Sequence, residues 1–137
     1  MVTDHPEHPY KGVRAGAVLV AKGDRLPYSD LGAVLDTWTD RHWLTSAEMH
    51  LALAEASLRG YNTGGTAAGF YQSGVEQSFG YWGAGGAATY LQNDTGLPLD
   101  YDDPKAAGPI NDFVSRITNT VKWDEGASDE IKLEKII

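Results

Sequence analysis

The sequence predicts a mainly α-helical protein built around a helical hairpin at residues 44–83, with long irregular loops on both sides. Two observations support this fold class. Apolar residues recur every three or four positions in two consecutive segments, which is the period of one helix face. Residues that start and stop helices bracket both segments. With 137 residues, 42% of them apolar, the chain fits a single globular domain or part of one.

The first helix begins at a capping box. Thr45 precedes Glu48 by three residues, so each side chain is placed to bond the backbone N–H of the other. Gly60 predicts the end of this helix, since glycine readily takes the left-handed conformation of a helix stop. Tyr61 is then expected to fold back on the helix end. One face carries Ala47, Leu51, Ala54 and Leu58.

The second helix is predicted to begin after the cap residue Thr66 and to pack antiparallel to the first. One stripe of this helix carries Tyr71, Val75, Ser78, Phe79 and Trp82. Gly74 and two other small residues, Ala67 and Gly69, permit close helix approach. The spacing of Ala67, Tyr71 and Gly74 also fits a tetratricopeptide (TPR) repeat, but one unit makes the hairpin only TPR-like.

The flanking segments are predicted to be less regular. Residues 1–43 form an irregular lead-in, within which residues 12–21 are either a strand or a buried extended segment. Residues 84–137 contain a short helix at 87–91, a proline-rich loop, and a segment at 110–122 that fits a helix or an extended chain. A truncated helix from about Ser128 ends the chain. Its apolar residues lead us to expect an interior fragment with exposed apolar ends: Ile131, Leu133, Ile136 and Ile137.

Four stretches resemble the signature of the SusD/RagB family, the outer-membrane nutrient-binding proteins of Bacteroidetes. They are TSAEMHLALAEASLRGY (45–61), YQSGV (71–75), SFGYWG (78–83) and KWDEGASDEIKLEKII (122–137). The resemblance implies that residues 1–137 are a fragment of one domain with a larger all-α SusD-like fold. It further implies glycan binding at the cell surface and partnership with a SusC-like TonB-dependent transporter. Family members are attached by a lipidated cysteine after a signal peptide, and this sequence carries neither.

Composition excludes several other functions. A net charge of −8 opposes binding to nucleic acid or to anionic lipid. The absence of cysteine excludes a thiolate metal site and a thiol nucleophile. Gly83, Gly85 and Gly86 follow a helix and lack the Lys-Ser/Thr pair of a phosphate-binding loop. We expect no cofactor.

We also expect no metal site and no catalysis. His5 and His8 are separated by a proline, which disfavours a shared helical face. In the acidic segment 100–103, an EF-hand register starting at Asp100 places Lys105 where glycine is required. We interpret this segment as a solvated turn. Neither a recognisable carboxylate pair nor a G-x-S-x-G motif supports a hydrolase.

Aromatic side chains are the candidate ligand contacts. We select Trp38, whose neighbours are all polar, and Tyr101, the aromatic residue of the acidic segment, as ligand-binding residues. Trp43 is instead expected to pack on the first helix. The leading hypothesis is a glycan- or nutrient-binding protein. The alternative is a TPR-like helical adaptor that binds a peptide or protein partner.

Overall fold

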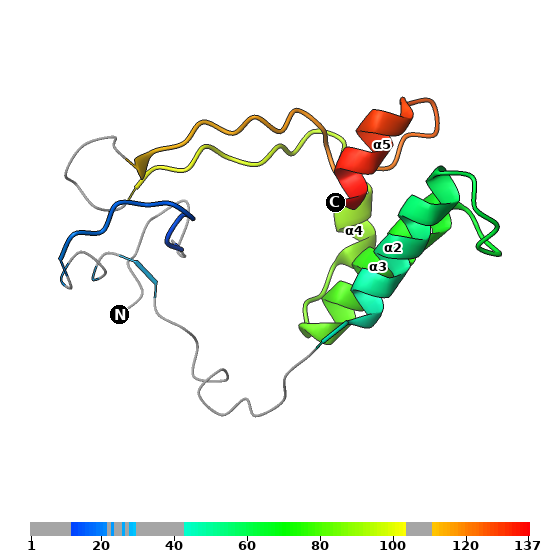
Figure 1. Cartoon of the computed structure of the whole chain (residues 1–137), viewed down its shortest axis with the longest axis horizontal. Helices are drawn as coiled ribbons and strands as arrows, with labels where there is room; N and C mark the ends of the chain where they lie inside the picture. The colour runs from blue at the N-terminus through cyan, green and yellow to red at the C-terminus, as the bar shows by residue number, and fades with distance from the viewer. Residues whose placement is uncertain (1–11, 22, 24–25, 27, 30–42, 104–110) are drawn as a thin grey trace. The chain divides into compact units, whose positions relative to one another are not determined.

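The computed structural model describes residues 12–21, 23, 26, 28–29, 43–103 and 111–137. They belong to two compact units, one from Met1–Asp40 with Pro98–Arg116 and the other from Arg41–Leu97 with Ile117–Ile137. The described residues of the second unit form the helices α2 (Ser46–Leu58), α3 (Ala67–Tyr81), α4 (Ala87–Leu91) and α5 (Asp129–Ile136) (Figure 1). The described residues contain no β-strand beyond an isolated bridge, which confirms the mainly α-helical prediction.

The helical hairpin forms as predicted, with α2 and α3 packed side by side (Figure 1). The capping box closes the start of α2: the Thr45 hydroxyl accepts the Glu48 N–H at 3.2 Å, and the Glu48 carboxylate accepts the Thr45 N–H at 2.6 Å. The Thr66 hydroxyl caps α3 by accepting the Gly69 N–H at 3.1 Å. Local side-chain chemistry therefore sets both helix starts.

Both hairpin helices end in a Schellman motif. After α2, Gly60 has a φ of 85°, its N–H donates to Ser57 O, and the Tyr61 N–H donates to Ala56 O, both at 3.0 Å. The corresponding bonds close α3, where Gly83 has a φ of 64°: the Gly83 N–H donates to Gly80 O at 3.2 Å, and the Ala84 N–H donates to Phe79 O at 2.9 Å. This confirms Gly60 as a left-handed stop. The Tyr61 side chain stays 70% exposed, so it covers little of the helix end, contrary to expectation.

The core of the second unit joins all four helices. Its buried residues are Ala54, Tyr71, Leu91 and Ile136. The ring of Tyr71 lies 5.2 Å from that of Trp123, and the Tyr71 hydroxyl donates to Val121 O at 2.7 Å. Leu91 of α4 is buried in this core beside Ala54 and Tyr71, which confirms that α4 packs back on the hairpin.

The C-terminal helix begins as predicted, with the Ser128 hydroxyl accepting the Ile131 N–H. The prediction that its apolar residues all lie exposed is wrong for Ile136, which is only 6% exposed, because α5 turns that residue into the core. Ile137 is 89% exposed and Ile131 is 37% exposed.

Gly74 allows the close approach of α2 and α3. A Cβ atom on this residue would lie 2.8 Å from Leu51 Cδ2 and 3.3 Å from the backbone oxygen of Ala47. These distances are below normal van der Waals contact, so only glycine fits without a shift of the neighbouring helix. This confirms the prediction that the small residue Gly74 permits close approach of the two helices.

The first unit is held by backbone pairing and polar contacts. Tyr101 and Phe113 form an antiparallel bridge through two backbone bonds of 2.8 and 2.9 Å. Residues 114–120 belong to no helix, so the described part of 110–122 is not the predicted helical alternative. Residues 12–21 form neither a strand nor a buried segment, because a turn at Gly16 (φ 79°) breaks them and Val20 is 87% exposed.

Candidate functional site

The two predicted ligand residues have different outcomes. Trp38 lies outside the described residues. Tyr101 is half-buried in the first unit, and its hydroxyl donates to Gly12 O at 2.9 Å. Burial raises the pKa of the Tyr101 phenol above its usual range. Its role in ligand binding stays a prediction.

A buried polar network lies in the same unit. The Tyr28 side chain, 3% exposed, donates from its hydroxyl to Asp103 Oδ1 at 2.6 Å. The Asn111 side chain, 1% exposed, donates to the other oxygen of Asp103 at 2.5 Å. Burial, followed by the bond to Asp103, raises the pKa of Tyr28. The solvated-turn interpretation therefore fits exposed Asp102 but not Asp103.

Asn111 organises this network. Its side-chain oxygen accepts the Val18 N–H at 2.8 Å, and its backbone oxygen accepts a bond from Arg14 Nε at 3.1 Å. The Arg14 guanidinium also lies 5.5 Å from the centre of the Phe113 ring, within cation–π range. The partners of these polar groups all lie inside the first unit, so we interpret the network as structural: it holds the segments of this unit together. No group of three metal-ligating side chains occurs in the part of the chain that the structure describes.

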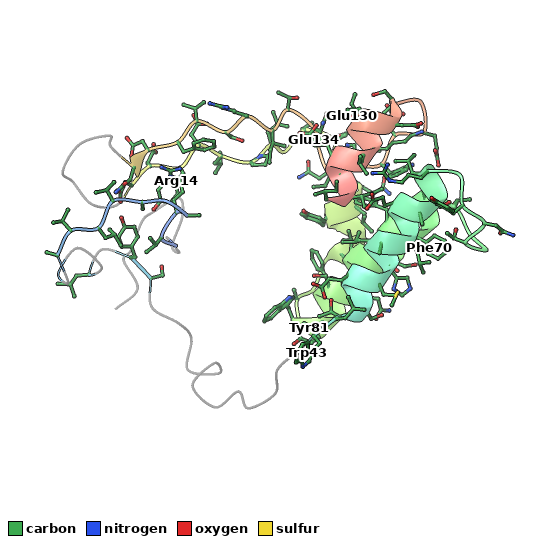
Figure 2. All side chains as sticks on the ribbon, in the orientation of Figure 1. Arg14, Trp43, Phe70, Tyr81, Glu130 and Glu134 are labelled. Carbon is green, nitrogen blue, oxygen red and sulfur yellow. The ribbon has the colours of Figure 1, made fainter. Side chains whose placement is uncertain are left out.

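Exposed aromatic residues gather at one end of the hairpin. Trp43, just before α2, is 98% exposed, so the expectation that it packs on the helix is wrong. Tyr81 and Trp82, at the end of antiparallel α3, are 40% and 65% exposed, and their rings meet edge to face at 5.0 Å. Figure 2 labels Trp43 and Tyr81 at this end. Such rings present flat apolar faces to a ligand or to another protein surface.

Two cavities lie next to Trp123 in the second unit. One of about 350 Å³ is bordered by α3 and α4 and lined by polar side chains that include Gln72, Glu76 and Gln92. The other, of about 570 Å³, is bordered by α5 and by residues 118–124. Lys122 and Trp123 line both cavities. Sequence reasoning missed these cavities, because Trp123 was noted only as part of a family motif.

Comparison with known proteins identifies the family. A family model described as SusD-like, the SusD and RagB outer membrane lipoproteins, matches residues 2–137. The chain belongs to the SusD-like family. No curated protein matches the sequence.

Solved structures agree with this membership. A chitin-binding SusD homologue from Flavobacterium johnsoniae is 38% identical, with a TM-score of 0.83 over 93% of this chain. A SusD homologue from Bacteroides thetaiotaomicron is 35% identical, with a TM-score of 0.77 over 93% of this chain. A SusD homologue from Bacteroides uniformis is 43% identical, with a TM-score of 0.62 over 69% of this chain.

The SusD-like chain spans only 19–26% of the length of these homologues. It nevertheless contains the motifs at 45–61, 71–75, 78–83 and 122–137, so the predicted family is confirmed. Among its described residues, the SusD-like chain has no helix with the length and apolar character needed to cross a bilayer.

Proposed function

We propose that this SusD-like chain is part of a glycan-binding protein of the outer membrane. The family match over residues 2–137 carries the proposal. The 38% identity to a homologue that binds chitin supports a carbohydrate ligand. Binding is the proposed activity, and no catalytic role is assigned.

The partner and the domain context belong to the same proposal. The protein works with a SusC-like TonB-dependent transporter, holding the glycan at the cell surface before import. Residues 1–137 form part of one SusD-like domain, in line with the greater length of the homologues. Trp38 and Tyr101 are proposed ligand contacts, since aromatic rings pack on the apolar faces of sugar rings.

Glycan binding is tested by calorimetry on the full-length protein. Chitohexaose is the first ligand, because a homologue binds chitin, and maltohexaose, xylohexaose and laminarihexaose extend the panel. Saturable binding of at least one glycan is expected. Binding to none of them, together with capture of a specific peptide by the hairpin, would favour the adaptor hypothesis instead.

The transporter partnership needs a separate experiment. Affinity purification of the tagged full-length protein from detergent-solubilised outer membranes should recover a TonB-dependent transporter. A tagged, unrelated outer-membrane lipoprotein is the control. Recovery of the same transporter by both proteins, or by neither, would contradict the partnership and leave glycan binding untouched.

A further inference from the structure

The larger cavity beside Trp123 has the properties of a small-molecule site. Its volume of about 570 Å³ falls within the range of about 300–1,000 Å³ that ligand pockets occupy. Its walls come from the segment 118–124 without Val121, from Asp94 after α4, from Ala127, and from Ile131 and Lys135 on α5. Every wall belongs to the second unit.

Hydrogen bonds hold the 118–124 wall in place before any ligand binds. The Lys135 ammonium donates to Thr120 O and, at 2.9 Å, to Lys122 O. The Lys122 N–H donates to Asn93 O at 3.1 Å, and the Asn119 amide donates to Glu134. Figure 2 labels Glu134 on α5. A wall ordered in advance lowers the entropy that ligand binding must overcome.

The charges of the cavity favour a neutral ligand. Two carboxylates, Asp94 and Asp124, are balanced by the ammonium groups of Lys122 and Lys135. Lys122 is paired with Asp94 at 3.2 Å, and Lys135 is bonded to backbone carbonyls. Neither an anion nor a cation therefore finds an excess of opposite charge in this cavity.

The remaining groups suit a ligand with many hydroxyl groups. The side-chain hydroxyls of Thr118 and Thr120 have no hydrogen-bond partner among the described residues, and both residues line the cavity. The Trp123 indole contributes aromatic surface, with the Tyr71 ring behind it at 5.2 Å. The indole N–H is buried and has no acceptor in the described structure, so we assign it no bond to the ligand, and the ring offers its apolar surface alone.

We propose that this cavity binds one or two sugar units of a neutral glycan, which bond Thr118 and Thr120 and contact Trp123. The inference rests on the proposed glycan-binding function and adds a binding site in the second unit to the contacts proposed at Trp38 and Tyr101 in the first. Neutral hexose units combine an apolar ring face with several hydroxyl groups, which matches the aromatic and hydroxyl-bearing wall.

The test uses the full-length protein and chitohexaose, or the tightest ligand of the panel above. Replacing Thr118 and Thr120 together by valine keeps the side-chain shape and removes both hydroxyls. We expect affinity to fall about tenfold or more, since two hydrogen bonds are lost. Thr89→Val, an exposed change on α4 outside both cavities, should leave affinity unchanged.

A second readout protects the test against an effect on folding. The indole N–H resonance of Trp123, assigned through Trp123→Phe, should shift during titration of the unmodified protein with the same dissociation constant as calorimetry. Unchanged affinity in the double variant, or an indole resonance that does not move while the glycan binds, would overturn the cavity assignment. Absence of glycan binding by the unmodified protein would instead overturn the proposed function itself.

Discussion

Replacing Gly74 by alanine tests how tightly the two hairpin helices pack. Two effects oppose each other. Alanine is favoured over glycine within a helix by about 1 kcal/mol. The added methyl group, however, would lie 2.8 Å from Leu51 Cδ2, 2.9 Å from Leu51 Cγ and 3.3 Å from Ala47 O. Overpacking of this kind costs about 1–3 kcal/mol. Because Cγ and a backbone oxygen are involved, rotation of one methyl group cannot relieve the contact. We therefore take the upper part of that range, about 2–3 kcal/mol, and expect a net loss of about 1–2 kcal/mol.

Urea unfolding followed by far-ultraviolet circular dichroism measures this loss. Gly80→Ala is the matched control, since Gly80 lies in the same helix and no atom lies within 4 Å of a Cβ built there. The control should gain up to about 1 kcal/mol from helix propensity alone. The cost of Gly74→Ala should also shrink in a Leu51→Ala background, because the clashing side chain is gone. Equal stabilisation by alanine at both glycines would refute the close-packing argument.

Three further changes test other parts of the fold. Gly60→Ala should lower the free energy of unfolding by about 1–2 kcal/mol, because alanine is strained at a φ of 85°; a melting temperature equal to that of the original protein would count against this. Bonds from the Thr45 N–H and hydroxyl lower the pKa of Glu48 below 4.5, so its stabilisation is complete above pH 4.5 and is lost as the pH falls through the folded-state pKa. The stability difference between the original protein and Glu48→Gln should therefore shrink in acid, and a pH-independent difference would contradict the capping box. Asn111→Asp places a second carboxylate against Asp103 and should cost about 3 kcal/mol or more at pH 7, with partial recovery in acid when melting is repeated at pH 4. A variant as stable as the original at pH 7 would show that the network is open to water.

Features that depend on local chemistry were predictable from the sequence. The caps at Thr45, Thr66 and Ser128 and the stop at Gly60 each depend on residues within a few positions of the helix end. The helix at 87–91 was predicted with the same bounds. Neighbouring residues alone decide these features, so a single sequence contains the necessary information.

Features that depend on distant partners were not predictable. Tyr28 and Asp103 are 75 residues apart in the sequence, and Val18 and Asn111 are 93 residues apart, so no local sequence pattern predicts their hydrogen bonds. The same reason explains the error at Trp43. Its position just before a helix suggested that it packs on that helix, but its burial depends on whether another part of the fold covers it, which the local sequence does not show. The cavity beside Trp123 combines residues 94, 118–124 and 127–135, and it exists only once these segments meet.

The burial of Ile136 beside Ala54, Tyr71 and Leu91 has a consequence for the order of folding. The α2–α3 hairpin can form early in folding, because its contacts are short in sequence. Its apolar face stays uncovered until α5, about fifty residues further along the chain, packs against it. A chain in which the hairpin has formed and α5 has not yet docked exposes this face to chaperones, to proteases and to other chains.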